Sequence, residues 1–258
     1  MIDTHAHLNY EDKYGDEKLL VRKIRDANVD EVIVVGWDLP SSVRAKEFAE
    51  KYDGYYYAAG IHPSDVNKAN ESDYDGIARL LAAEKAVAVG EIGLDYHYDE
   101  TDELAQKRAF VLQMEIARAH KLPFIIHSRD AAEDTLSILK QNKDKLAYGA
   151  VMHCFSGSVE TAKEYLKLGL YISFAGPVTF KNARKLDEVA KIVPCDRILA
   201  ETDSPYLAPE PCRGTLNTPA NVAFVTKKLA LLRGESEEKT AEDICRNAHT
   251  LFYKMQRR

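Results

Sequence analysis

Short β-rich runs alternate with longer amphipathic stretches along the whole chain, and this alternation constrains the fold more than any other feature. The candidate strands are mostly continuous apolar runs, as expected for parallel strands covered on both faces. They span residues 1–7, 31–37, 55–61, 86–92, 123–128, 148–153, 170–175 and 196–201. Eight such alternations in 258 residues favour a closed (β/α)8 TIM barrel over an open doubly wound sheet.

The segments between the candidate strands carry helix signals. Thr101 is predicted to be the N-cap of the helix before the fifth strand, with two acidic residues in its first turn. A proline-rich loop follows the eighth strand, and two more helices are predicted over 220–233 and 238–256. No linker or low-complexity tract interrupts the pattern, so we expect a single TIM-barrel domain over residues 1–258.

Composition bounds the class of protein. With 45% hydrophobic and 29% charged residues, the chain is expected to be globular with a sizeable core. It has no long apolar run and no secretory signal at its start, so we expect a cytoplasmic protein without a membrane partner. The four cysteines form no CxxC pair, which predicts reduced thiols. A net charge of −6 argues against a protein that coats long duplexes, so any nucleic acid must be bound locally.

Histidines and acidic residues cluster at the carboxyl ends of the candidate strands. In a (β/α)8 barrel these ends meet at one rim, where catalytic groups lie. Five of the eight histidines and two acids fall there, namely His5, His7, His62, Glu91, His127, His153 and Asp203. A purely structural role would bury many polar groups without evident partners, which is costly in free energy. The pattern therefore predicts a metal site at this rim.

The number of candidate ligands predicts two cations. His5 and His7 are alternate residues of one strand, so their side chains point to the same side and can bind one cation. Four imidazoles and two carboxylates exceed the roughly three protein ligands of a single open catalytic metal. We predict two divalent metal ions (Mg, Mn or Zn) that share Glu91 and keep positions for water or substrate. The first is assigned His5, His7, Glu91 and Asp203, and the second His127, His153 and the other oxygen of Glu91.

Six motifs, in the order MIDTHAHL, GIHP, GEIGLDY, PFIIHSRDA, HCFSGS and ETDSPYLAP, closely resemble those of the TatD family of metal-dependent deoxyribonucleases in the amidohydrolase superfamily. The resemblance runs from Met1 to about Phe252. It implies a (β/α)8 barrel with a dinuclear site that works with Mg²⁺ and cleaves DNA, often from the 3′ end. Carried over residue by residue, the family's metal ligands fall on the six residues that spacing assigned: His5, His7, Glu91, His127, His153 and Asp203.

Three departures from the family pattern concern substrate binding. Ser64 follows GIHP where another histidine is common, and His97 and Tyr98 follow GEIGLDY where an aromatic residue and an arginine are common. The loop after ETDSPYLAP reads Cys212-Arg213-Gly214-Thr215-Leu216, whereas the family loop is typically more basic. These departures leave the metal ligands intact and the exact substrate open.

Three residues besides the bridging Glu91 are assigned catalytic or substrate-binding roles. Asp203 is the candidate general base, because a carboxylate that binds a metal can also accept a proton from water; a pure ligand role is the alternative. Arg129 is the candidate phosphate-binding group, with a salt bridge to a nearby acid as an equal alternative. His62 is the candidate donor to phosphate or to the leaving oxygen, with loop bracing as the alternative.

Aromatic residues just beyond the strands are candidates for stacking on bases, although most aromatic side chains serve packing. They are Trp37, Tyr96, Phe155 and Tyr206.

The predicted function is that of a divalent-metal-dependent deoxyribonuclease, a 3′–5′ exonuclease acting on single-stranded DNA or DNA 3′ ends with water activated at the dinuclear site. No obligate protein partner is expected. The main alternative is a metal-dependent amide or ester hydrolase, including a D-aminoacyl-tRNA deacylase-like activity, because the same cations polarise a carbonyl group. A catalytically silent binding protein is the second alternative, and retention of the whole ligand set disfavours it.

Overall fold

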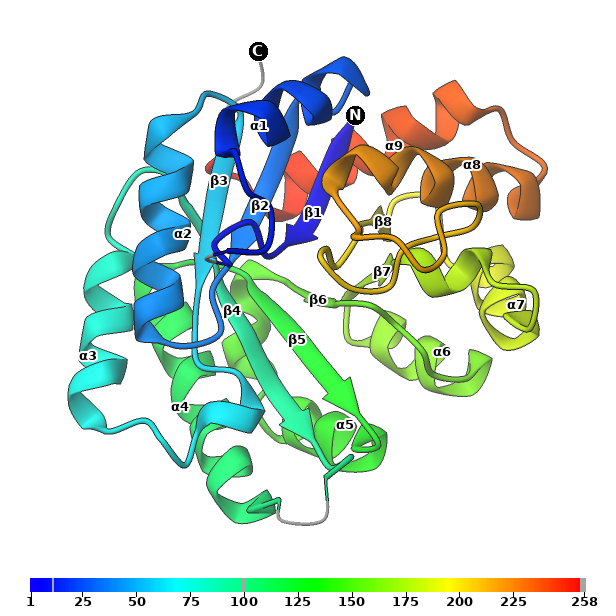
Figure 1. The fold of residues 1–258 in the computed structure, drawn as a ribbon. Coiled ribbons are helices and arrows are strands. Elements are labelled where there is room, and N and C mark those ends of the chain that lie inside the picture. The colour runs from blue at the N-terminus through cyan, green and yellow to red at the C-terminus, as the bar shows by residue number, and fades with distance from the viewer. Residues whose placement is uncertain (11, 99–100, 256–258) are drawn as a thin grey trace.

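The computed structural model describes residues 1–10, 12–98 and 101–255 of the chain. Its strands form one eight-stranded parallel sheet in sequence order (Figure 1). The strands are β1 (Ile2–Ala6), β2 (Glu31–Val35), β3 (Tyr55–Ala59), β4 (Ala86–Asp95), β5 (Phe124–Arg129), β6 (Ala150–Met152), β7 (Tyr171–Phe174) and β8 (Ile198–Ala200). Each strand overlaps one of the runs expected from sequence, and the predicted (β/α)8 barrel is confirmed.

The barrel closes through the segment that follows β8. The backbone N–H of Asp203 donates to the carbonyl of His5 at 3.0 Å, and the N–H of His7 donates to the carbonyl of Ser204 at 2.7 Å. Ala6 and Ser204 also form a parallel bridge. The first and last strands therefore meet at the rim where the predicted ligands lie.

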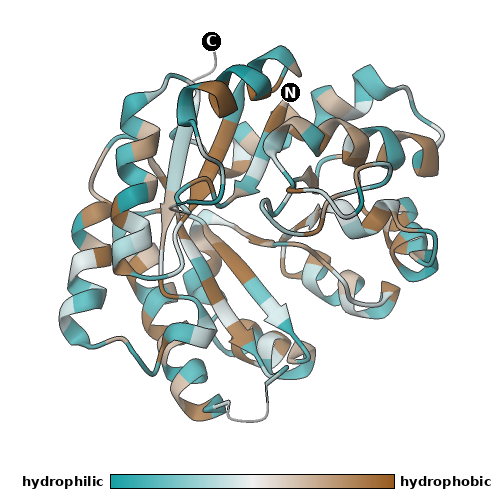
Figure 2. Ribbon diagram, in the orientation of Figure 1, coloured by the Kyte–Doolittle hydropathy of each residue, from teal (hydrophilic) through white to brown (hydrophobic). Residues whose placement is uncertain are grey.

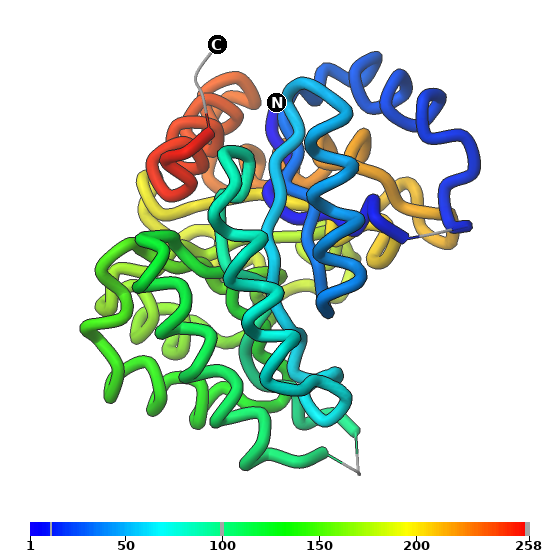
Figure 3. Tube along the Cα trace, turned by 90° about the vertical axis from the view of Figure 1, so that its left-hand side faces the viewer, coloured from blue at the N-terminus to red at the C-terminus, as the bar shows by residue number. Residues whose placement is uncertain are grey.

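Helices cover the outside of the sheet. They are α1 (Glu17–Asp26), α2 (Leu39–Lys51), α3 (Glu71–Leu80), α4 (Glu103–His120), α5 (Ala132–Gln141), α6 (Val159–Lys167), α7 (Arg184–Ile192), α8 (Val222–Arg233) and α9 (Glu237–Leu251). Short 3-10 turns lie in connections between strands and helices: η1 (Pro63–Asp65), η2 (Lys143–Tyr148), η3 (Gly176–Thr179) and η4 (Pro219–Asn221). Seen from the side, α2, α3 and α4 lie next to one another along the sheet (Figure 3).

Three predicted helix ends differ from those observed. Asp102, and not Thr101, is the N-cap of α4, because its carboxylate accepts the N–H of Ala105 at 2.9 Å while the Thr101 hydroxyl donates to the backbone of Tyr98. The helix predicted from residue 220 begins at Val222, after a 3-10 turn. The last helix ends at Leu251, and residue 256 of its predicted range lies outside the described residues.

Hydrophobic burial holds the strands and helices together. Residues 32–35 of β2 are fully buried, and apolar residues concentrate on the strands and the inward helix faces (Figure 2). Burial of this apolar surface is the main term that stabilises such a fold. Among the described helices, none combines the length and the hydropathy that a bilayer-spanning segment needs.

Candidate metal centre

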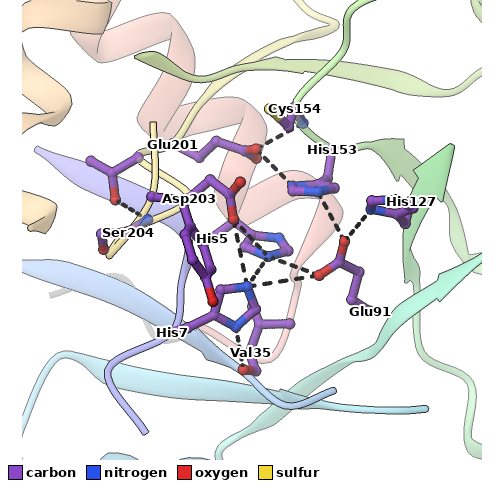
Figure 4. Close-up of polar contacts among 12 residues, drawn as sticks. His5, His7, Val35, Glu91, His127, His153, Cys154, Glu201, Asp203 and Ser204 are labelled. Atoms are coloured by element: carbon purple, nitrogen blue, oxygen red, sulfur yellow. Dashed lines mark hydrogen bonds and ion pairs between the residues drawn. The ribbon is translucent and has the colours of Figure 1, made fainter. Parts of the chain in front are cut away.

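The structure brings the six predicted ligands together at the carboxyl ends of the strands (Figure 4). They come from five strands or the segments just after them: His5 in β1 and His7 after it, Glu91 in β4, His127 in β5, His153 after β6 and Asp203 after β8.

The sequence predicted Glu91 at the end of its strand, but the structure places it inside the strand. Strand β4 continues to Asp95, and its register against β5 shifts between Val89 and Ile92. Two residues on, Gly93 has φ +142°, and a Cβ there would lie 2.0 Å from the carbonyl oxygen of His127. Only glycine fits this close approach of β4 to β5, which brings Glu91 next to His127.

The two carboxylate oxygens of Glu91 face two different histidine pairs. Oε1 lies 2.7 Å from Nδ1 of His127 and 3.0 Å from Nε2 of His153. Oε2 lies 3.4 Å from Nε2 of His5 and 3.8 Å from Nε2 of His7. This is the arrangement that a carboxylate shared between two cations requires, and it has the same division of residues as the partition predicted from spacing.

Asp203 lies on the His5–His7 side of the centre (Figure 4). Its Oδ1 is 3.5 Å from Nε2 of His7 and 3.9 Å from Nε2 of His5. Burial opposes ionisation of Asp203, but the hydrogen bond from His7 and the nearby imidazoles outweigh it, so the pKa of Asp203 lies below its usual value. Asp203 is therefore an ionised carboxylate at neutral pH.

Three of the imidazoles have an oxygen acceptor at the ring nitrogen that points away from the centre. The pairs are His7 Nδ1 with the carbonyl oxygen of Val35 (2.9 Å), His127 Nε2 with Oδ2 of Asp95 (3.1 Å) and His153 Nδ1 with Oε1 of Glu201 (2.8 Å). A proton held at the outer nitrogen leaves the inner nitrogen free to bind a cation, and metal-binding histidines commonly have such partners.

Sequence reasoning missed Glu201 and Asp95. Glu201 is buried and accepts three hydrogen bonds, from His153, from the backbone N–H of Cys154 at 2.7 Å and from the Ser173 hydroxyl at 2.6 Å. Both acids stand in motifs quoted above, ETDSPYLAP and GEIGLDY, within four residues of a predicted ligand. An acid this close to a ligand, at a strand end, was the available signal.

The charges at the centre fit divalent cations. In the described part of the chain, the ion pairs of Glu91 and Asp203 involve imidazoles and neither lysine nor arginine. Buried carboxylates need compensating positive charge. A donor set of imidazole nitrogens and carboxylate oxygens suits Zn²⁺ or Mn²⁺, and the carboxylates also suit Mg²⁺.

His62 lies next to the centre but is arranged as a donor and not as a ligand. With Asp95 and His127 it forms a group whose candidate metal-binding atoms lie within 4.8 Å of one another. However, its Nδ1 accepts the N–H of Ser64 at 3.1 Å, and burial lowers the pKa of His62 to about 3. The neutral ring therefore carries its proton on Nε2, which lies 3.7 Å from Oε1 of Glu91.

Arg129 ends β5, and its exposed side chain lies outside the ligand cluster. Its guanidinium carbon lies 5.8 Å from the ring centre of Tyr98. No ion pair between Arg129 and Asp130 is observed, and Oδ2 of Asp130 lies 3.1 Å from Nδ1 of His97. None of the ion pairs among the described residues includes Arg129.

Of the four candidate stacking residues, the structure places two beside the centre. The ring centroids of Trp37 and Tyr206 lie 5.5 Å and 6.5 Å from that of His7. Phe155 is buried, and the Tyr96 hydroxyl donates to Asp134 at 2.9 Å.

Comparison with known proteins identifies the family. The family model described as "TatD related DNase" matches residues 2–253. This chain belongs to the TatD family. YabD of Bacillus subtilis (strain 168), named a metal-dependent hydrolase, is 45% identical to this TatD-family chain over 252 residues, which is 98% of each protein. A Shigella flexneri protein named "3'-5' ssDNA/RNA exonuclease TatD" is 32% identical, again over 98% of each.

A solved structure agrees with both the family and the fold. The crystal structure of YJJV, a TatD homolog from Escherichia coli K12, superposes on this TatD-family chain with a TM-score of 0.93 at 32% identity, covering 98% of each chain. The chain is therefore a metal-dependent hydrolase of the TatD family with a (β/α)8 barrel.

Proposed function

We propose that this TatD-family protein is a divalent-metal-dependent deoxyribonuclease that removes nucleotides from the 3′ end of DNA. The observation that carries the proposal is the position of Glu91, whose two oxygens face two separate histidine pairs. A relative 32% identical to this chain is named as a 3′–5′ ssDNA/RNA exonuclease, which supports a single-stranded nucleic acid substrate and the polarity.

The six predicted ligands would hold two cations in the partition given above. When bound, the cations would neutralise phosphate oxygens and make a water molecule more acidic. The protein contributes the fixed positions of the ligands: the outer hydrogen bonds to Val35, Asp95 and Glu201 hold three imidazole rings in place.

Asp203 and His62 supply the proton chemistry in this proposal. Asp203 is ionised and partly accessible, with 14% of its side chain exposed, so it can accept a proton from the attacking water. His62 presents an N–H from Nε2 on the opposite side of Glu91 and donates a hydrogen bond to a phosphate or leaving oxygen. Arg129, which is exposed, is the candidate contact for a neighbouring phosphate.

The test uses metal-stripped protein reconstituted separately with Mg²⁺, Mn²⁺ or Zn²⁺ and a single-stranded DNA labelled at its 5′ end. We expect a ladder that shortens from the 3′ end, and its loss in Glu91→Gln. Glu188→Gln is the matched control, because it removes the same charge from an exposed pair with Lys191. Hydrolysis of D-aminoacyl-tRNA or of simple amides, with DNA left intact under every metal, would overturn the proposal in favour of the amide or ester hydrolase.

A further inference from the structure

Three aromatic rings from three different loops form a continuous surface, which we call the aromatic wall: Tyr10 after β1, Trp37 after β2 and Tyr206 after β8. Tyr10 and Trp37 stack with ring centroids 4.5 Å apart and an interplanar angle of 28°. The hydroxyls of Tyr10 and Tyr206 are hydrogen-bonded at 2.6 Å. The wall thus links the loops that follow the first and last strands.

The aromatic wall borders the metal centre directly. Trp37 and Tyr206 each approach the imidazole of His7 edge to face, with interplanar angles of 74° and 68°. His7 is a predicted ligand, so the wall contacts a residue of the first predicted cation position. The candidate phosphate-binding groups come from other strands of the rim: His62 follows β3 and Arg129 ends β5.

The ring of Tyr206 is both accessible and fixed in place. Tyr206 is 46% exposed, so a planar ligand can reach it. Its backbone N–H donates to Asp203 at 3.0 Å, and its carbonyl accepts from the Asn217 amide at 2.7 Å. A fixed, exposed aromatic ring costs little entropy when it binds a planar partner.

We propose that the aromatic wall is the stacking site for the base of the nucleotide whose phosphate lies at the metal centre. The inference rests on the proposed phosphodiesterase function and adds a nucleobase to the substrate requirement. Aromatic side chains stack on bases of any sequence, because every base has a π-face. The proposed function removes nucleotides from the 3′ end, so the base stacked there would be that of the last nucleotide of the strand.

A pair of small esters separates base recognition from phosphodiester hydrolysis. Thymidine 5′-(p-nitrophenyl) phosphate and methyl p-nitrophenyl phosphate share the leaving group and differ in the base and sugar. We expect Tyr206→Ala to raise KM for the thymidine ester roughly 10-fold or more and to change kcat/KM for the methyl ester by less than about twofold. Tyr206→Phe is the matched control, because it keeps the ring and loses the bond to Tyr10.

Equal effects of Tyr206→Ala on both esters, or no effect on either, would overturn the stacking site. Failure of the wild-type protein to hydrolyse either ester under any metal would instead count against the proposed function.

Binding can be measured without turnover, because Trp37 is the single tryptophan of the chain. We expect thymidine 5′-monophosphate to quench its fluorescence in a saturable way, with the dissociation constant raised roughly 10-fold or more by Tyr206→Ala. 2-Deoxyribose 5-phosphate, which lacks the base, is the control ligand. If it bound as tightly as thymidine 5′-monophosphate, or if the nucleotide left Trp37 fluorescence unchanged, the wall would not be a base-stacking site.

Discussion

Replacing Glu201 by glutamine tests whether a residue outside the predicted ligand set controls the second cation. Glu201 accepts hydrogen bonds from His153, Cys154 and Ser173. A glutamine can keep the acceptor toward His153 and turn its NH₂ toward the Ser173 hydroxyl, so the variant should fold. The variant loses the negative charge at Nδ1 of His153. In the wild type this charge makes the imidazole a stronger metal ligand.

Loss of such a partner typically weakens metal binding 10- to 100-fold, or about 1.4–2.7 kcal/mol. Titration of metal-stripped protein with Mn²⁺ by calorimetry should show two cations for the wild type and a selectively weaker second one for Glu201→Gln. The first should be retained, because the outer nitrogen of His7 contacts Val35 and not Glu201. Glu188→Gln controls for net charge. Identical two-step titrations of Glu201→Gln and wild type would refute the reasoning.

Two further predictions concern Asp203 and Asp3. Asp203→Asn should still bind two cations but lose roughly 100-fold or more in turnover, because an amide oxygen can coordinate and cannot take the proton; turnover within about 10-fold of wild type would remove the base role. Buried Asp3 accepts bonds from His5 and Thr202, yet burial raises its pKa from 3.8 to about 8. Folding therefore favours its protonated form, so the contribution of Asp3 to the free energy of unfolding of the metal-free protein should fall as pH rises from about 4 to 8, by up to ~1.4 kcal/mol per unit. Asp3→Asn should remove that contribution, so the difference between wild-type and variant free energies of unfolding from urea titrations should change with pH; a constant difference would contradict it.

The fold was predictable because each strand has a local signal in the sequence. A run of apolar residues between helical segments can be recognised as a strand without knowing what packs against it. The barrel then follows from the number of such runs. The ligand cluster was predictable for a related reason, since the barrel brings all carboxyl ends of its strands to one rim. His5 and His7 needed no more than the alternation of side chains along a strand.

The hydrogen bonds behind the ligands were not predictable from spacing. Whether Asp95 faces His127 depends on the register of β4 against β5, and that register shifts near Glu91. The contact of Glu201 with His153 depends likewise on how the loop after β6 meets β8. The Tyr10–Tyr206 pair joins two loops from opposite ends of the chain. Loop conformation leaves no periodic signal in sequence.

Closure of the barrel by Asp203 and Ser204 has a consequence for synthesis in the cell. The predicted first cation position takes His5, His7, the shared Glu91 and Asp203, and the segment with Asp203 also supplies the backbone bonds to His5 and His7. A nascent chain that has not yet emerged past this point carries an unfinished centre. The proposed centre can therefore be completed only after Asp203 and Ser204 have been synthesised, when β1 gains its last neighbour.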